Sequence, residues 1–175
     1  MPIPKYALLE NERRFLVAPA RLPDLTGLPF RQIEDRYVTG TRLRLRSMTD
    51  SETGVRDLKL CKKYPGGDPV SGPITNLYLA EAEHQLLSAL PARTIVKRRY
   101  RLPHGGRSFG LDLFDGELSG LMLCEAEAES REAIMALAFP PWAVREVTDD
   151  PFFSGGNLCA ITAAELEVRL REAPP

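Results

Sequence analysis

The stretch ALLENERRFLVAP, residues 7–19, places five consecutive charged or polar residues between apolar flanks. In a β-strand, side chains two positions apart point to the same face. Glu10, Glu12 and Arg14 would therefore lie together on one face, with the two residues between them on the other. A strand that gathers charge on one face is the first indication of how this chain folds.

Composition and charge narrow the class of protein. The 175 residues, 43% apolar and 27% charged, predict one globular domain covering residues 1–175. A net charge of −1 means that attraction for an anionic partner must come from local segregation of charge. The chain lacks both an apolar run near the ~20 residues of a membrane span and a signal peptide's apolar core. Three widely spaced cysteines favour neither a disulfide framework nor a zinc site, so we expect a cytoplasmic protein.

Short alternating segments between turn residues predict a β-rich chain of the α+β class. We predict strands near 8–17, 33–39, 42–48, 55–63, 94–102, 107–114 and 120–129, with a further short strand near 145–149. We predict helices at 77–90, 130–139 and 162–173, and an irregular connection at 19–30.

Charges of one sign gather on one face of each predicted strand. The sets that share a face are Arg42, Arg44 and Arg46; Lys59 and Lys63; Lys97, Arg99 and Arg101; and Glu125, Glu127 and Glu129. An antiparallel sheet with one wet face is the simplest explanation. Such a face usually mixes signs, however, because like charges opposite one another on neighbouring strands are destabilising. A sheet closed with this face inward would instead hold a polyanion by Arg and Lys and a hard divalent cation by carboxylates.

The segment ENERRF (10–15) resembles the ExExK opening motif of the CYTH superfamily, the triphosphate tunnel metalloenzymes. Further matches follow in the family's order and spacing: RLRLR (42–46), KLCKKY (59–64), VKRRY (96–100), LDLFDGELSGLMLCEAE (111–127) and REVTDD (145–150). The resemblance spans residues 8 to 160. It implies a closed eight-stranded antiparallel β-barrel, the triphosphate tunnel, flanked by a few helices. It also implies binding of triphosphate compounds with Mg²⁺ or Mn²⁺.

The same resemblance assigns roles to individual residues. The implied metal ligands are Glu10, Glu12, Glu125 and Glu127, with Glu127 the stronger candidate of the later pair. The implied phosphate-binding residues are Arg44, Arg46, Lys97, Arg99 and either Lys59 or Lys63, of which motif spacing favours Lys63. The implied catalytic set is Glu10, Glu12, Arg14, Tyr37 and Asp112. In it, Asp112 orients basic neighbours, and Tyr37 matches a tyrosine that in some members pairs with the motif's lysine.

Two departures from the family pattern matter. Arg14 stands where the motif has lysine; arginine can hold phosphate with two donors but stays protonated, so it cannot act as a general base. Whether Arg14 serves in place of lysine or the role has moved stays open. In GPITNLYLAEAE (72–83), Asn76 and Tyr78 stand where many members carry glutamates. Glu81 or Glu83 could supply the missing acid.

Three functions fit these residues. The leading hypothesis is a metal-dependent hydrolase of triphosphate compounds, an inorganic tripolyphosphatase with nucleoside triphosphates as further substrates. The alternatives are an adenylate cyclase that forms cyclic AMP from ATP and a non-catalytic polyphosphate- or nucleotide-binding module. The expected partner is a small-molecule triphosphate or polyphosphate, with no membrane and no nucleic-acid duplex, since a closed tunnel admits none. The sequence leaves a homodimer open.

Overall fold

The computed structural model describes residues 3–65 and 68–172, and antiparallel strands dominate it. The strands are β1 (Leu8–Val17), β2 (Phe30–Val38), β3 (Leu43–Asp50), β4 (Arg56–Lys63), β5 (Ser71–Tyr78), β6 (Ala92–His104), β7 (Arg107–Phe114), β8 (Met122–Ala128) and β9 (Ala143–Glu146). The α-helices are α1 (Glu81–Leu87), α2 (Arg131–Met135), α3 (Gly155–Leu158) and α4 (Ala163–Arg171). Short 3₁₀ turns are η1 (Pro19–Arg21), η2 (Gly116–Leu118) and η3 (Pro151–Phe153). Within the described residues, no helix has the length and apolar character of a membrane span.

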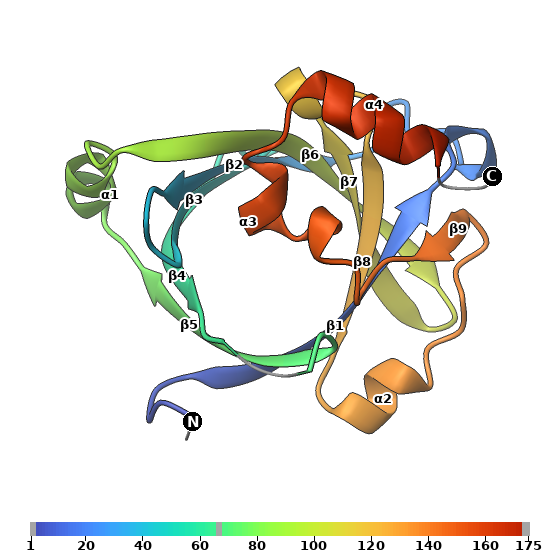
Figure 1. Ribbon diagram of the computed structural model, residues 1–175, viewed down its shortest axis with the longest axis horizontal. Helices are drawn as coiled ribbons and strands as arrows, with labels where there is room; N and C mark the ends of the chain where they lie inside the picture. The colour runs from blue at the N-terminus through green and yellow to red at the C-terminus, as the bar shows by residue number, and fades with distance from the viewer. Residues whose placement is uncertain (1–2, 66–67, 173–175) are drawn as a thin grey trace.

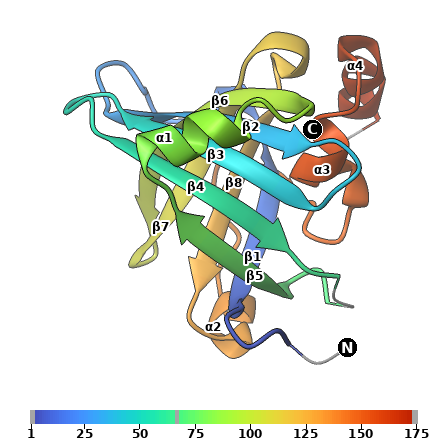
Figure 2. The ribbon, with the colours of Figure 1, turned by 90° about the vertical axis from the view of Figure 1, so that its left-hand side faces the viewer.

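The strands close into a barrel, as predicted. They are hydrogen-bonded in the order β5-β4-β3-β2-β6-β7-β8-β1, and β1 pairs again with β5 to complete a ring of eight (Figure 1). Every pairing is antiparallel, and β9 adds to β1 beside the ring. Seen from the side in Figure 2, β3, β4 and β5 lie next to one another and run obliquely across the molecule. Such a tilt accompanies barrel closure.

Strand β1 changes partner halfway along its length. Residues 8–11 pair with β5, whereas residues 15–17 pair with β9. Between them, the backbone N–H of Glu12 donates to the carbonyl of Val70 (2.9 Å) and that of Arg14 to Thr148 Oγ1 (3.0 Å). Beyond the first residue of β5, the C-terminal part of the chain therefore takes over as the partner of β1. This arrangement admits the segment after β9 into the mouth of the barrel.

The barrel interior is apolar where the C-terminal part of the chain enters it. The inward-facing Leu16, Ile95, Phe114 and Leu123 pack there against residues 147–158, which we call the plug segment; its contributions are Val147, Phe153 and Leu158. Figure 1 shows α3, part of this segment, within the outline of the ring. A second apolar cluster, which includes Phe15, Phe109 and Trp142, lies on the outer face of the strands beside α2. The charged residues of the interior lie beside this apolar packing.

The differences from the predicted elements centre on residues 71–90. The eighth barrel strand is β5, which the strand prediction missed because Gly72 and Pro73 are residue types depleted in strands. The helix predicted at 77–90 is α1, residues 81–87, since residues 77–78 belong to β5. The short strand near 145–149 is β9, which begins at Ala143 and lies beside the ring. The helix predicted at 130–139 ends at Met135, ahead of the prolines at 140–141.

Candidate functional site

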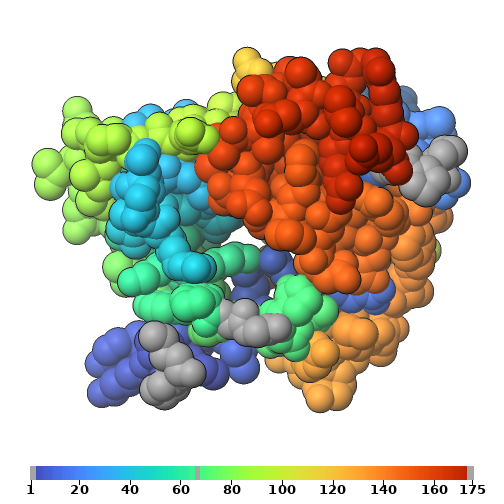
Figure 3. Space-filling view, viewed as in Figure 1, coloured from blue at the N-terminus to red at the C-terminus, as the bar shows by residue number. Residues whose placement is uncertain are grey.

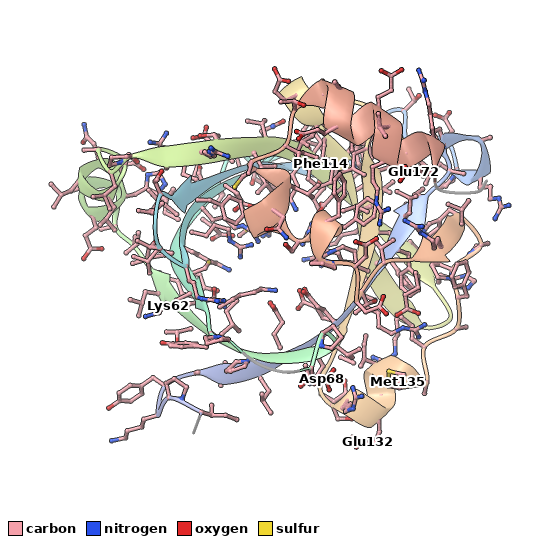
Figure 4. All side chains as sticks on the ribbon, viewed as in Figure 1. Lys62, Asp68, Phe114, Glu132, Met135 and Glu172 are labelled. Carbon is pink, nitrogen blue, oxygen red and sulfur yellow. The ribbon has the colours of Figure 1, made fainter. Side chains whose placement is uncertain are left out.

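Beside the plug segment, the barrel interior holds a cavity of about 450 Å³. Figure 3 shows this hollow between the orange-red C-terminal segment and β3–β5, with blue β1 at its bottom. In Figure 4, side chains from the surrounding strands point into the ring, with Phe114 on the side of α3 and Asp68 across from it. The charged residues that line the cavity are Glu10, Glu12, Arg14, Asp35, Arg42, Arg44, Arg46, Lys63, Asp68, Lys97, Arg99, Glu125 and Glu127. The period-2 alternation of the strands thus brings most of the sequence-predicted site residues together.

Strands β1 and β8 form an acidic wall. Directly paired residues of antiparallel neighbours share a face, and the register pairs Glu12 with Glu127 and Arg14 with Glu125. Two carboxylates directly opposite one another are unfavourable unless a cation joins them. At Glu12 and Glu127, the cavity therefore brings two negative charges together.

Lys63 is the first cation at this wall. Its Nζ lies 2.6 Å from Glu10 Oε2 and 2.9 Å from Glu12 Oε1. Burial works against the charge, but Glu12 and Glu10 outweigh it and raise the pKa of Lys63. Of the two candidate lysines, the structure places only Lys63 on the cavity; the Nζ of Lys59 lies 4.6 Å from the ring centroid of Tyr78 instead.

Arg14 is the second cation, and protein groups engage it on three sides. Its Nε donates to Glu125 Oε1 (2.8 Å), one terminal nitrogen to Glu12 Oε1 (3.1 Å) and the other to the carbonyl of Phe153 (3.1 Å). Burial opposes its charge, but Glu125 and Glu12 together raise the pKa of Arg14 above the ordinary arginine value. Arg14 therefore stays protonated, and it ties the acidic wall to the plug segment.

A buried carboxylate, Asp112, organises the basic side formed by β6. Asp112 accepts one bond from Lys97 (2.5 Å) and two from Arg99 (both 2.6 Å). It is fully buried and is not among the residues that line the cavity, so it acts from beneath the two cations. Arg99 also reaches Glu125 Oε2 at 2.5 Å. Burial and then the charge of Arg99 lower the pKa of Lys97 despite its bond to Asp112.

A second buried carboxylate, Asp35, organises β3. It accepts two bonds of 2.6 Å from Arg46, while the Nε of Arg44 lies 3.6 Å away, beyond hydrogen-bond range. Burial opposes ionisation, but Arg46 and Arg44 hold the pKa of Asp35 well below its usual range. The Arg44 Nε is buried and has no hydrogen-bond partner among residues 3–65 and 68–172. Since an unsatisfied buried donor costs about 1–3 kcal/mol, this orphaned N–H marks a place for an anion.

Glu127 differs from the other carboxylates of the cavity. Within the part of the chain that the structure describes, Glu127 lacks an ion pair, whereas Glu10, Glu12, Asp35, Asp68 and Glu125 each have at least one. Loss of hydration, and then the nearby charges of Glu10 and Glu125, raise the pKa of Glu127. An additional cation would relieve this repulsion.

The carboxylates suit a hard divalent cation that shares its coordination sphere with a ligand. Among residues 3–65 and 68–172, no group of three or more His, Cys, Asp or Glu side chains forms a ready-made metal site. Mg²⁺ in phosphate-binding sites usually takes one or two protein carboxylates and fills its other positions with phosphate oxygens and water. Glu12 and the unpaired Glu127, opposite one another on neighbouring strands, match that requirement. The donor set therefore fits Mg²⁺ or Mn²⁺ in the presence of a phosphate ligand.

Tyr37 lies in the cavity wall beneath the plug segment. A Cβ built on Gly155 would approach the Tyr37 hydroxyl to 1.8 Å, so only glycine leaves room for the ring at this point. Burial is the largest cause that raises the pKa of Tyr37, which keeps its hydroxyl protonated. Tyr37 and Arg14 are therefore both held in their protonated forms.

Some expectations about the site were wrong or incomplete. Glu81 and Glu83 do not supply the missing acid: Glu81 pairs with Arg56 at the surface, and Glu83 accepts the N–H of Ala80 at the start of α1. Sequence reasoning missed Asp35, although the spacing of EDRYV, with Asp35 two residues before Tyr37, could have revealed it. It also missed the plug residues of the cavity wall, Thr148, Ser154, Gly155 and Gly156, which lie outside regular strands and carry no charge.

The chain is a closed antiparallel barrel with acidic and basic walls around an internal cavity. No family model matches the chain. An inorganic triphosphatase of Nitrosomonas europaea is 35% identical over 150 residues, 82% of this chain and 91% of that protein. An inorganic triphosphatase of Acetivibrio thermocellus is 25% identical over 159 residues, 85% of this chain and 92% of that protein. The crystal structure of the inorganic triphosphatase NE1496 superposes with a TM-score of 0.57 at 29% identity, covering 87% of this chain and 95% of that one. The chain belongs to the CYTH superfamily of triphosphate tunnel metalloenzymes.

Proposed function

We propose that the protein is a metal-dependent inorganic triphosphatase that hydrolyses a terminal phosphoanhydride bond of tripolyphosphate, with nucleoside triphosphates as further substrates. The observation that carries this proposal is the pairing, within one cavity, of the unpartnered donor of Arg44 with the unpaired carboxylate of Glu127. The relatives that cover most of the chain are inorganic triphosphatases, which supports the same substrate class.

The basic residues would bind the phosphate chain. Arg44 has a free donor, and Arg42 lines the cavity beside it on the approach to β3. Guanidinium groups bind phosphate oxygens through two parallel donors, so these residues fix orientation as well as charge. Lys97 and Arg99, held from beneath by Asp112, would neutralise the charge that develops on the equatorial oxygens during transfer.

The acidic residues would hold Mg²⁺ or Mn²⁺. Glu10, Glu12 and Glu127 are the carboxylates available for it, whereas both oxygens of Glu125 are already engaged by Arg14 and Arg99. When bound, the metal supplies Lewis-acid neutralisation at the phosphate oxygens. Hydrolysis then consists of in-line attack of water on the terminal phosphorus and departure of diphosphate. Arg14 does not accept the proton of that water, because it stays charged.

Phosphate release tests this function. Tripolyphosphate, ATP and pyrophosphate are offered to the wild type, Glu12→Gln and Glu129→Gln, with Mg²⁺, with Mn²⁺ and with a chelator. Glu129 follows β8 with a side chain 79% exposed, so it is a matched acidic control. We expect the wild type to release phosphate from tripolyphosphate only with metal. The rate should fall at least about 100-fold in Glu12→Gln, a loss typical of groups that stabilise transition-state charge. The rate should be unchanged in Glu129→Gln.

Two other outcomes would replace the proposal. Cyclic AMP and pyrophosphate formed from ATP would identify a cyclase. Tight tripolyphosphate binding without release of phosphate under any metal condition would identify a binding module.

A cytoplasmic location belongs to the same proposal. Cys61, Cys124 and Cys159 are free thiols, as is usual in a reducing compartment. The proposed partner is a small-molecule triphosphate. Size-exclusion chromatography with light scattering would decide between a monomer and the homodimer that the sequence leaves open.

A further inference from the structure

Lys63 occupies an unusual position for a phosphate-binding lysine. It lies at the end of β4, and its ammonium is shared between Glu10 and Glu12 of β1 at 2.6 and 2.9 Å. An ammonium has three donors, and these contacts use two of them on the acidic wall. In this arrangement Lys63 neutralises carboxylates rather than presenting its charge to a phosphate.

Glu10 and Glu12 cannot serve Lys63 and a divalent cation at once. A bound Mg²⁺ sits about 2.1 Å from its ligand oxygens, which would place it within a few ångströms of the ammonium. Cations so closely spaced repel one another. We therefore expect one of the cations that contact Glu12 to move when the metal enters.

The two cations that contact Glu12 differ in their freedom to move. Arg14 has a side chain 13% exposed and is bonded to Glu125 and to the carbonyl of Phe153 as well as to Glu12. The side chain of Lys63 is 47% exposed and ends a flexible four-carbon stem. Lys63 can swing while Arg14 stays, and a bound phosphate would offer it a new partner in the cavity.

We propose that Lys63 is a displaceable internal cation: it neutralises Glu10 and Glu12 in the free protein and passes to a substrate phosphate as the divalent metal takes these carboxylates. This inference rests on the proposed function. Its consequence is positive coupling, in which metal and triphosphate each bind more tightly when the other is present. By thermodynamic linkage the two enhancements are equal.

Calorimetric titration of Mn²⁺ measures this coupling without any turnover. Wild type, Lys63→Met and Lys62→Met are titrated alone and with imidotriphosphate, whose bridging NH groups resist hydrolysis. Lys62 is the matched control, because it is the adjacent residue on the same strand and points to the outer face, 5.2 Å from the ring centroid of Tyr64. We expect Lys63→Met to bind Mn²⁺ alone about tenfold more tightly than the wild type, a coupling of ordinary size. In Lys63→Met, the factor by which imidotriphosphate increases the Mn²⁺ affinity should be smaller by about the same amount. Lys62→Met should match the wild type in both measurements.

Equal Mn²⁺ affinities for the wild type and Lys63→Met, or an unchanged enhancement by imidotriphosphate, would overturn the proposal. Absence of Mn²⁺ binding in every variant would overturn it as well. Lys63→Gln, which keeps a polar side chain of similar length, replaces Lys63→Met if that variant does not fold. The titration needs no catalysis, so the two proposals can fail separately. If the coupling is absent, the phosphate-release experiment still tests the proposed function. If the protein has no turnover, the coupling can still be measured.

Discussion

Two neighbouring regions of the barrel interior are built on the same strands and differ in chemistry: the apolar packing around the plug segment and the charged lining of the cavity. On β1, Leu16 packs with the plug segment and Arg14, two residues earlier, lines the cavity. On β8 the change from apolar to charged falls between Leu123 and Glu125, and on β6 between Ile95 and Lys97; Leu123 and Ile95 also border the cavity. One step of the period-2 repeat thus separates apolar packing from charged groups.

The two regions contribute differently to the protein. Apolar burial around the plug segment stabilises the fold by about 25 cal/mol for each Å² removed from water. In the charged region, desolvation of ions costs free energy that pairing only offsets, so ion pairs there are weak evidence for stability. Substitutions in the packing around the plug segment should therefore lower stability, whereas the unpaired charges of the cavity should matter mainly for ligand binding.

Phe153→Ala should give the largest loss of stability. The Phe153 side chain is 1% exposed in the apolar packing of the plug segment, and loss of a buried phenylalanine costs about 3–5 kcal/mol. Urea denaturation followed by the fluorescence of Trp142 measures the loss. Phe139→Ala is the control, since Phe139 is 49% exposed and makes one edge-on contact with Phe15, and it should cost about 1 kcal/mol. Equal losses for the two variants would contradict the plug's stabilising role.

Asp35→Asn should give the next effect, and it should depend on pH. The carboxylate is 1% exposed and paired with Arg46, and removing one member of such a pair costs about 3 kcal/mol at pH 7. Arg46 and Arg44 hold the pKa of Asp35 below its unfolded value, so its contribution to stability is complete above about pH 5 and is lost as pH falls further. Denaturation midpoints of wild type and variant should therefore converge over the acid range below about pH 5. A difference that stays constant over this range would refute the assignment.

Gly155→Ala should give the smallest loss of stability of the three variants. The new Cβ would lie 1.8 Å from the Tyr37 hydroxyl, and forcing a buried ring aside costs about 1–3 kcal/mol. Gly156→Ala is its neighbour and control: a Cβ there meets nothing within 4 Å, and alanine favours the helix by up to about 1 kcal/mol. Thermal denaturation should show the first variant less stable than the wild type and the second at least as stable. The reverse order would mean that α3 does not pack on Tyr37.

The parts of the molecule that the sequence reveals are those with a strict period of two. Glu10, Glu12 and Arg14 share the cavity because a strand alternates, and the same rule places Arg44, Lys97 and Glu125. This rule explains why most of the charged lining could be predicted, whereas the closed barrel was an expectation from the family resemblance.

What the sequence does not reveal depends on contacts between distant segments. Strand β5 carries Gly72 and Pro73 and forms because β1 and β4 offer it partners on both sides. The plug segment has no periodicity to detect, and its place is set by its apolar packing in the barrel mouth and by the bond from Arg14 to the Phe153 carbonyl. The partners of Arg14 likewise follow from strand register rather than from the motif that contains it.

The most direct test of this account is anomalous diffraction at the manganese edge from crystals grown with Mn²⁺ and imidotriphosphate. The account predicts one or more manganese peaks inside the barrel, about 2.2 Å from carboxylate oxygens of Glu10, Glu12 or Glu127. It also predicts a phosphate group at the Nε of Arg44 and no manganese among the apolar side chains around Phe153. Manganese and triphosphate bound only outside the barrel would contradict it.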